Sequence, residues 1–454
     1  MKISTENPLN VLWIMADQLR YHALSSSGDP NISTPNIDRL AAEGLRCTAA
    51  FSQYPVCGPF RASLMTGLHA TSSGTLRHGD FLDPGLRTVA DSFKDAGYQT
   101  SYVGKWHLAP ETGAHMVSPE GWIGQSFWVH PKFRGGFEDW FGFNVSNNYF
   151  ETYIATGEKI SPQRLEGYQT DALTDISLEY LAKKPEGQPW FHVISYESPH
   201  PGFGGNPRSR LYPVPEPYES QFDPVDIILR DNVPEEHQQD AKVQMAGYYR
   251  LITNLDANVG RVLDWLDYSG QADKTLVVFF SDHGEMGGSQ GLKNKQVPYE
   301  ESLHIPLIWR LPGKVPGGID YDNLICGLDI YPTSAGFCNI PIAEKIQGLD
   351  YSDVLAAART TALREDVLVQ WESPRFAFGD HPYRAIRTST HTYAVGRDAN
   401  FCLLFDHEQD PWEKVNKFWE SDSQELRKVL HHKLEKLIQH SGEEPPDYLS
   451  KYAV

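Results

Sequence analysis

The stretch "NVLWIMADQ", residues 10–18, decides the predicted fold. It is continuously apolar from Val11 to Ala16 and ends in Asp17 and Gln18. A strand that helices cover on both faces has such an unbroken apolar run, whereas a strand with one face in water alternates apolar and polar residues. The stretch therefore predicts a central strand with polar side chains at its carboxyl end.

Similar apolar stretches recur along the chain, and helical patterns separate them. "GQPWFHVISYESPH" (187–200) and "KTLVVFFSDHGE" (274–285) each predict a buried strand that ends in polar residues. "LRTVADSFKDAGYQTSYVGKWHL" (86–108) predicts a helix to about Ala96, followed by a strand into Gly104. Alternating strands and helices indicate an α/β fold: a large mixed, mainly parallel sheet sandwiched by helices.

Two helices have clear sequence signals. In "STPNIDRLAAEGL" (33–45), Thr34 is a candidate N-cap, Pro35 suits the first helical position and Gly44 suits the end. A longer helix is predicted from about Glu236, because apolar residues recur there at spacings of three and four. The stripe they form is expected to face the core and comprises Met245, Tyr248, Ile252, Leu255, Val259, Val262 and Leu266.

The pattern changes toward the C-terminus. Short strands separated by turns are predicted within 383–395 and 400–413, and an amphipathic helix within 423–442. We therefore predict two domains. A large α/β domain would span residues 1–372, and a smaller subdomain with a small antiparallel sheet and a terminal helix would span residues 373–454.

The chain has 454 residues and a formal net charge of −19. This charge argues against nucleic acid and an anionic membrane surface as partners, and an anionic substrate would need a local metal ion or basic cluster. No segment reaches the apolar length of a membrane span, and the N-terminal segment lacks a signal-peptide cleavage site. We expect a cytoplasmic protein, or a periplasmic or secreted one if a leader has been removed. The sequence allows a homo-oligomer.

The cysteines are few, odd in number and widely spread: Cys47, Cys57, Cys326, Cys338 and Cys402. This spacing is typical neither of a disulfide framework nor of a zinc site, so most of them are expected to be buried thiols. Cys57 has three interpretations. It is a structural thiol, a catalytic thiolate, or the precursor of another functional group.

"YPVCGPFRASLMTG" (54–67) places Cys57 at the start of a short helix that Pro59 is predicted to begin and Gly67 to end. A helix N-terminus attracts anions and lowers the pKa of a thiol, and Arg61 follows about one turn later. A thiol phosphatase loop, however, has a longer separation between cysteine and arginine than the three residues between Cys57 and Arg61. The spacing therefore counts against a thiolate mechanism of that kind.

Polar residues end four of the predicted strands and should meet at one edge of the sheet. Oxygen and imidazole ligands for a hard divalent cation, Ca²⁺ or Mg²⁺, are offered by Asp17, Gln18, Asp282 and His283. Positive charge and hydrogen-bond donors are supplied by Arg61, Lys105, His107, His200 and Lys295. A metal ion surrounded by such donors is what a tetrahedral oxyanion ester requires.

Together these motifs resemble the type I, formylglycine-dependent sulfatases of the alkaline phosphatase superfamily. The family signature Cys-x-Pro-x-Arg is matched by Cys57, Pro59 and Arg61. Further motifs follow in the family's order over nearly the whole chain: "NVLWIMADQ", "TPNIDRLAAEGL", "GKWHL", "SPHPGF", "DHGE", "GLKNKQVPYEES" and "LFDHEQDPWE". The resemblance implies an alkaline-phosphatase-like fold and a sulfuric ester hydrolase.

The resemblance also implies a mechanism and a set of roles. Cys57 would be oxidised by a formylglycine-generating maturation enzyme; one hydroxyl of the hydrated aldehyde would attack the sulfur of a sulfated small molecule or saccharide, and the other would expel sulfate. The ligands of Ca²⁺, or of Mg²⁺ as the alternative, would be Asp17, Gln18, Cys57, Asp282 and His283. The other catalytic residues would be Arg61 and His107 beside the diol, Lys105 and Lys295 on the sulfate oxygens, and His200 as the acid.

The sequence departs from the family pattern at three positions. Gln18 stands where many members have a second Asp, so the site keeps an oxygen ligand but loses one negative charge. Phe60 stands where Ser or Ala is usual, and Gln290 stands near a position where some members have His. Lys295 fits the family's spacing before "PYEES", and Lys293 is the alternative.

The substrate is predicted less directly. Aromatic residues crowd the segment 121–153, where some would stack on sugar rings and most are expected to be core: Trp122, Phe127, Trp128, Phe133, Phe137, Trp140, Phe141, Phe143, Tyr149, Phe150 and Tyr153. A carbohydrate sulfate is favoured over a small aryl or alkyl sulfate. Two rival functions remain: a phosphonate monoester or phosphate diester hydrolase with the same motif, and a non-catalytic sulfated-glycan-binding protein whose Cys57 stays unmodified.

Overall fold

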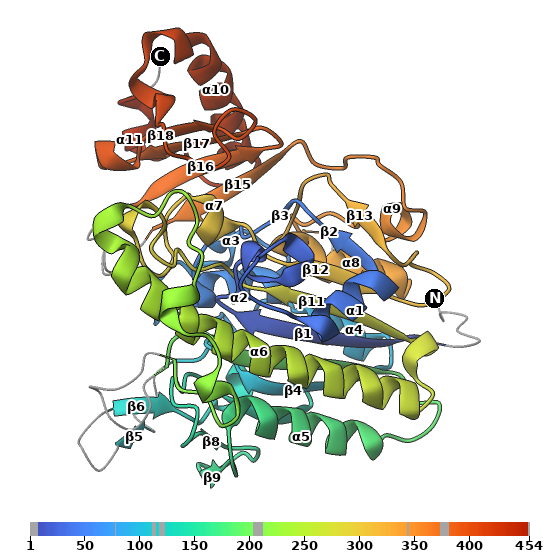
Figure 1. The fold of residues 1–454 in the computed structure, drawn as a ribbon. Coiled ribbons are helices and arrows are strands. Elements are labelled where there is room, and N and C mark those ends of the chain that lie inside the picture. The colour runs from blue at the N-terminus through green and yellow to red at the C-terminus, as the bar shows by residue number, and fades with distance from the viewer. Residues whose placement is uncertain are drawn as a thin grey trace.

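A mixed sheet of eight strands, in the order β13-β2-β12-β11-β1-β10-β4-β7, forms the centre of the molecule (Figure 1). The computed structural model describes residues 8–77, 79–110, 115–117, 123–202, 212–342, 345–372 and 381–452. The strands of the sheet are β1 (Asn10–Asp17), β2 (Leu45–Cys47), β4 (Gln99–Lys105), β7 (Asp139–Phe143), β10 (Trp190–Pro199), β11 (Thr275–Ser281), β12 (Leu307–Arg310) and β13 (Ile319–Tyr321). The stretch at residues 10–18 thus forms an inner strand, as its apolar sequence predicts.

The central strands of this sheet run parallel. β1 lies parallel between β10 and β11, and β4 and β7 continue in the same direction beyond β10. β12 runs antiparallel to both β11 and β2, so the sheet is mixed and mainly parallel, as predicted. Because β11, β1, β10 and β4 are parallel neighbours, their carboxyl ends meet at one edge of the sheet.

Helices cover both faces of the sheet (Figure 1). Trp13 packs on one face in a core that includes α2, α4 and α8, whereas Leu12 and Ile14 pack on the other face with α1, α5 and α6. These helices are α1 (Pro35–Glu43), α2 (Cys57–Thr66), α4 (Val89–Asp95), α5 (Gln169–Ala182), α6 (Gln238–Tyr268) and α8 (Ile330–Phe337). Successive residues of β1 enter opposite cores, which explains why none of them from Val11 to Ala16 is polar.

The two helices with clear sequence signals form close to the predicted positions. α1 begins at Pro35 and is capped by Gly44, and α6 spans Gln238–Tyr268. Thr34 occupies the predicted N-cap position, but its hydroxyl donates to the Asp38 carboxylate at 3.1 Å and makes no cap hydrogen bond. The apolar stripe of α6 is buried, as predicted.

Helix α2 begins at Cys57, two residues before the predicted start at Pro59. Val56, with φ −160°, is the last extended residue, and Gly67 ends the helix with φ +70°. Cys57 is therefore the first helical residue, and its side chain stands at the N-terminal end of the helix.

A second sheet of four antiparallel strands lies toward the C-terminus, as predicted (Figure 1). Its elements are β15 (Asp366–Trp371), β16 (Tyr383–Thr388), β17 (His391–Gly396), β18 (Leu403–Asp406), α10 (Gln424–His440) and α11 (Asp447–Ser450). β15 precedes residue 372 yet pairs with β16 along its whole length. The domain division at residue 372 stays a prediction, and residues 373–380 lie outside the described part of the chain.

The remaining elements are short. They are β3 (Ala50–Phe51), β5 (His115–Val117), β6 (Ile123–Ser126), β8 (Tyr153–Ile154), β9 (Gln163–Arg164), β14 (Ile325–Cys326), α3 (Ala70–Ser73), α7 (Glu300–Leu303) and α9 (Ser352–Ala356). None of the described helices has the length and apolar character needed to cross a bilayer.

The aromatic segment is mostly core, as expected. Phe127, Trp128, Phe137, Trp140, Phe143 and Tyr149 are buried. Phe150 is the large hydrophobic residue of this segment that is exposed, at 41%. Trp122 lies outside the described residues.

Candidate active site

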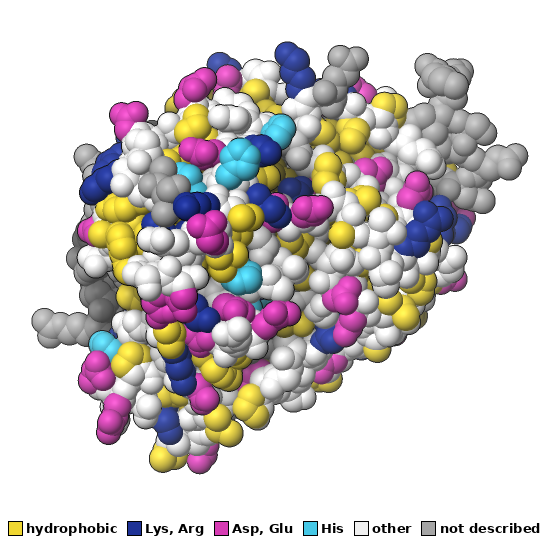
Figure 2. Space-filling view, turned by 90° about the horizontal axis from the view of Figure 1, so that it is seen from above, with side chains coloured by type: hydrophobic (Ala, Val, Ile, Leu, Met, Phe, Trp, Pro, Cys, Tyr) yellow, Lys and Arg dark blue, Asp and Glu magenta, His cyan; other side chains and the backbone are white. Residues whose placement is uncertain are grey.

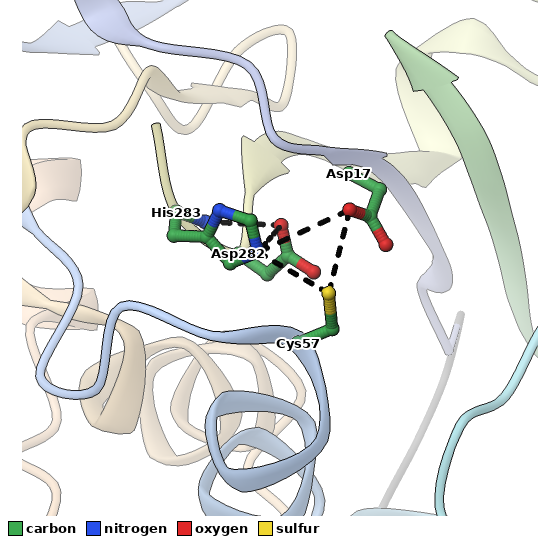
Figure 3. Close-up of side chains that lie close together, drawn as sticks. All are labelled: Asp17, Cys57, Asp282 and His283. Atoms are coloured by element: carbon green, nitrogen blue, oxygen red, sulfur yellow. Dashed lines mark hydrogen bonds and ion pairs between the residues drawn. The ribbon is translucent and has the colours of Figure 1, made fainter. Parts of the chain in front are cut away.

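Four residues from three parts of the chain meet at the carboxyl edge of the sheet (Figure 3). Asp17 ends β1, Asp282 and His283 follow β11, and Cys57 begins α2. The Cys57 Sγ lies 3.3 Å from His283 Nε2 and 3.6 Å from Asp17 Oδ1. His283 Nε2 in turn lies 3.6 Å from Asp282 Oδ1.

Local backbone contacts fix the directions of these side chains. His283 Nδ1 bonds the Gly284 carbonyl oxygen at 3.0 Å, so this nitrogen carries the proton and Nε2 faces the site as an acceptor. Asp282 Oδ1 accepts from the backbone N–H of Gln18 at 2.9 Å and of His283 at 3.0 Å. The ends of β1 and β11 are thereby tied together beneath the site.

The cluster fits a divalent metal ion. One ligand atom from each of Asp17, Cys57, Asp282 and His283 lies within 4.8 Å of the others. Asp282 Oδ2 is buried without a hydrogen-bond partner among the described residues. Two carboxylates, an imidazole and the neighbouring Gln18 amide offer the oxygen-rich set that hard cations prefer.

Two cations pair with these carboxylates. Arg61 Nη2 lies 3.0 Å from Asp17 Oδ2 and 3.3 Å from Asp282 Oδ2, and Lys105 Nζ lies 2.9 Å from Asp17 Oδ2. All four side chains are almost completely buried. Arg61 thus contacts both carboxylates, and its contact with the hydrated aldehyde stays a prediction.

The two carboxylates differ in their protonation behaviour. Burial would raise the pKa of Asp17, but the charges of Lys105 and Arg61 outweigh it and hold this pKa well below the usual value. Burial together with the charge of Asp17 raises the pKa of Asp282 to about 7. Two adjacent buried carboxylates do not ionise independently, and a bound cation would favour the charged form of both.

The surroundings of Cys57 disfavour the thiolate interpretation. Burial, with a further contribution from Asp17, raises the pKa of the Cys57 thiol to about 12. The N-terminus of α2 therefore does not produce a thiolate near neutral pH. Cys57 remains a neutral thiol at the centre of a polar cluster, which a purely structural thiol would not need.

Phe60, the unusual residue of the signature, packs in the core under α2. Its ring edge occupies the space beside Gly327, where a Cβ at residue 327 would lie 2.4 Å from the ring. Phe60 therefore packs against Gly327 and fits because position 327 has no side chain.

The structure also places the remaining predicted residues. Lys295 donates through Nζ to the Oε1 atom of Gln18, whereas Lys293 is half exposed and pairs with Asp240 at 3.6 Å. Lys295 rather than Lys293 is thus the lysine in the site. His107 is buried two residues after Lys105 and has a left-handed backbone with φ +59°.

His200 follows the carboxyl end of β10. Its Nδ1 bonds the Pro201 carbonyl oxygen at 2.8 Å, so Nε2 is the nitrogen without the proton. Burial, together with the charges of Lys295 and Lys105, holds the pKa of His200 well below its usual value. His200 is therefore neutral until an anion offsets these lysines.

Sequence reasoning missed polar residues inside the apolar strand β10. Ser195 Oγ accepts from Arg61 Nη1 at 2.8 Å and donates to the Lys105 carbonyl oxygen at 2.7 Å. Glu197 Oε1 lies 3.3 Å from Lys105 Nζ, and its carboxylate also accepts from the backbone N–H of Ser146 and Asn147. Both were detectable as polar residues within a strand that is buried on both faces.

Comparison with known proteins identifies the family. The family model described as Sulfatase matches residues 9–340, and the model described as N-sulphoglucosamine sulphohydrolase, C-terminal, matches residues 288–440. The ulvan-active sulfatase of Formosa agariphila is 31% identical over 450 residues, which cover 98% of this chain and 84% of that protein.

Solved structures share the fold. A Bacteroides thetaiotaomicron structure described under the metabolism of multiple glycosaminoglycans has a TM-score of 0.84 at 24% identity, covering 98% of this chain and 99% of the other. The phosphonate monoester hydrolase of Agrobacterium radiobacter has a TM-score of 0.76 at 24% identity, covering 95% and 96%. From its family match, its full-length relative and the fold, the chain belongs to the sulfatase family of the alkaline phosphatase superfamily and is a sulfuric ester hydrolase.

Proposed function

We propose that this protein hydrolyses a sulfate ester on a carbohydrate, with formylglycine derived from Cys57 and a divalent metal, Ca²⁺ before Mg²⁺. The observation that carries the proposal is the position of Cys57. Its thiol is fully buried at the start of α2, within 3.6 Å of Asp17 and His283. A side chain at this point meets a candidate metal site on one side and the positive end of a helix on the other.

The metal would act as a Lewis acid, and the hydrated formylglycine would supply the hydroxyl group that attacks sulfur. The residues that would hold the metal are Asp17, Gln18, Asp282, His283 and the modified Cys57. Because Cys57 has no exposed surface in the folded chain, we infer that a maturation enzyme modifies it before folding is complete.

The cations of the site would bind the sulfate group. Lys105 is held between Asp17 and Glu197, and Lys295 is held by the Gln18 amide, so both ammonium groups are preorganised. Fixed donors stabilise charge that develops on the sulfate oxygens more effectively than water does. Arg61 would act through the two carboxylates that it aligns.

His200 and His107 would serve the reacting oxygens. His200 Nε2 starts as an acceptor, and a bound sulfate anion would offset Lys105 and Lys295 and raise its pKa. A protonated His200 would then donate to the leaving oxygen. His107, two residues after Lys105, would orient the hydroxyl groups of the hydrated aldehyde.

The substrate class rests on relatives and on charge. Ulvan is named for the Formosa agariphila relative and glycosaminoglycans for a structural neighbour, so a sulfated saccharide is favoured over an aryl sulfate. The chain carries a net charge of −19, yet Figure 2 shows Lys, Arg and His side chains interspersed with Asp and Glu on the face seen from above. An anionic sugar would therefore not meet a uniformly negative surface there.

A phosphonate monoester or phosphate diester hydrolase is the second candidate, because a solved enzyme of that class shares the fold. Parallel kinetics on sulfate monoesters and phosphate diesters separate the two. We expect kcat/KM to favour the sulfate ester, and a large preference for the diester would contradict the proposal.

The substrate is best sought with a panel of sulfated saccharides of defined linkage, with Cys57→Ala as the blank. The intact mass of the Cys57 peptide reports whether formylglycine is present. Protein made with a competent maturation system that shows only thiol would contradict the mechanism and favour a non-catalytic glycan-binding role. A sulfatase whose cysteine is known to be converted to formylglycine, produced in the same host, shows whether that host carries out the modification.

A further inference from the structure

A buried carboxylate stands behind the metal-type residues and takes no part in the function described so far. Glu285 lies two residues after His283 and has no exposed surface. Among the described residues, no lysine, arginine or histidine forms an ion pair with it. An unpaired buried carboxylate is costly unless hydrogen bonds compensate the charge.

Four N–H groups compensate the charge of Glu285. Its Oε1 accepts from Gln244 Nε2 at 2.9 Å and from the backbone N–H of Gly287 at 2.9 Å and Asn294 at 2.8 Å. Its Oε2 accepts from Gln18 Nε2. The carboxylate thus connects helix α6, the loop after β11 and the end of β1.

The contact with Gln18 fixes the direction of an amide that would otherwise be free to turn. A carboxylate only accepts hydrogen bonds and an ammonium group only donates them. Gln18 lies between Glu285 and Lys295, so its Nε2 must face Glu285 and its Oε1 must face Lys295. Donation to a charged acceptor also polarises the amide and increases the negative charge on Oε1.

The contact with Asn294 fixes the position of the lysine. Lys295 lies between two residues with left-handed backbone, Asn294 with φ +68° and Gln296 with φ +82°. Such conformations persist only where surrounding contacts hold them. The loop is closed by the bond from the Asn294 N–H to Glu285 and by the Met286 N–H, which donates to the Asn294 carbonyl oxygen at 2.7 Å.

We propose that Glu285 is a positioning residue for both the metal and the sulfate group: it orients and polarises the Gln18 amide and holds the loop that carries Lys295. The proposal rests on the proposed function, since it assumes a metal ligand at Gln18. Its distinctive consequence is that the charge of Glu285 acts through the Gln18 amide. A variant with Glu at position 18 and Gln at position 285 should therefore still bind the metal.

The test is calorimetric titration of the full chain, freed of metal by a chelator, with CaCl₂. Glu285→Gln keeps the shape of the side chain but turns an NH₂ group toward donors, and we expect the affinity for Ca²⁺ to fall by about 10- to 100-fold. The double variant Gln18→Glu/Glu285→Gln keeps the heavy atoms and the total charge, and it should regain wild-type affinity. The matched control is Glu301→Gln, a second fully buried carboxylate, which contacts Arg230 and Asn232 and should not change the affinity.

Two results would overturn the proposal: Glu285→Gln binding Ca²⁺ within about twofold of wild type, or a double variant as weak as the single one. If Glu285→Gln fails to fold, the double variant decides; folding and binding by it support the proposal, and failure of both assigns Glu285 a purely structural role. Absence of Ca²⁺ binding by wild type and Glu301→Gln alike would instead contradict the proposed metal, and the proposal with it.

Discussion

Two buried clusters in this chain have similar composition and different surroundings. The catalytic cluster consists of Asp17, Cys57, Asp282 and His283, and the interface cluster consists of Glu300, His407 and Glu413. In both, ligand atoms lie within 4.8 Å of one another. The interface cluster connects α7 to the segment that follows β18, so it joins the large sheet region to the C-terminal sheet.

In the interface cluster the protein itself pairs Glu300, whereas Glu413 Oε1 is buried without a hydrogen-bond partner among the described residues. Glu300 Oε1 lies 2.7 Å from Arg387 Nε, and Glu300 Oε2 lies 3.2 Å from His304 Nδ1. Glu413 Oε2 accepts from the Glu300 backbone N–H at 2.9 Å. Glu300 is thus paired through Oε1 by a cation in direct contact.

In the catalytic cluster the cations leave room for ligands. Arg61 and Lys105 share Asp17 Oδ2, while the Oδ1 atom of the same residue faces the Cys57 thiol. The comparison teaches that residue types alone do not define a metal site. What matters is which oxygen atoms remain after the neighbouring donors have been counted, and four predictions test that difference, from the largest expected effect to the smallest.

The strongest test replaces the residue that has no counterpart in the interface cluster. Cys57→Ala should lower kcat/KM on sulfate esters by at least about 10⁴-fold, because the nucleophile would be lost. Cys47→Ala, which removes another fully buried thiol, should leave kcat/KM unchanged and lower only the melting temperature. Equal activity of the two variants would rule out a special role for Cys57.

Breaking the ion pair of the interface cluster should affect stability instead of catalysis. Glu300→Gln leaves Arg387 without its charged partner in a buried position, and we expect a loss of about 3–5 kcal/mol in the free energy of unfolding. Glu425→Gln, which removes an exposed partner of Lys428, should change it by less than about 0.5 kcal/mol. Denaturant titration measures both, and kcat of the folded Glu300→Gln protein should match wild type.

The lysines of the loop after β11 sharpen the comparison further. Lys295→Ala should lower kcat/KM by about 10²- to 10³-fold, as removal of one fixed donor does in other hydrolases. Lys293→Ala should have little effect, since its side chain is 50% exposed and pairs only with Asp240 in the described structure. A larger loss of kcat/KM in Lys293→Ala than in Lys295→Ala would instead assign the sulfate contact to Lys293.

The smallest effect is a pH dependence of the interface cluster. Burial, with the charges of Glu300 and Glu301, raises the pKa of Glu413 well above its usual value. The folded protein favours neutral Glu413 more than the unfolded chain does. Its contribution to the free energy of unfolding is therefore fully present below the pKa of Glu413 in the unfolded chain, and it declines as the pH rises toward the pKa of Glu413 in the folded protein. Glu413→Gln cannot ionise, so relative to wild type it should gain about 1.4 kcal/mol per unit of pKa shift across that range.

Unfolding curves of wild type and Glu413→Gln between about pH 5 and 8 check this expectation. The groups that face Glu413 are Glu300, Glu301, His407 and Arg387. Two curves that stay parallel over the whole range would show that Glu413 is ionised in the folded protein.

Much of the fold could be predicted because each signal was local. The apolar run before Asp17 indicated a doubly covered strand, and Gly44 indicated a helix end, and both are present. The start of α2 was missed by two residues because Pro59 is also tolerated inside the first turn. Thr34 is the N-cap residue as predicted, but its hydroxyl bonds Ser25 and Asp38 instead of a helix N–H.

The candidate site could be predicted as a set of residue types at strand ends, without their pairings. Asp17, Lys105, His200 and Asp282 each end or follow a strand, so their convergence followed from a parallel sheet. The contacts of Ser195, Glu197 and Glu285 were not identified, because they join residues that are far apart in the sequence and meet only after folding. Likewise, only the folded loop distinguishes Lys295 from Lys293.

By itself the sequence determined the α/β architecture, the family and the position of Cys57 at the start of a helix, because apolar periodicity and short motifs are properties of neighbouring residues. The tertiary structure decided the rest. Burial makes Cys57 a neutral thiol, Gly327 leaves space for Phe60, and Glu285 stands behind Gln18. These facts depend on atoms far apart in the chain, whose distances and solvation exist only after the sheet, its helices and the loop after β11 have packed together.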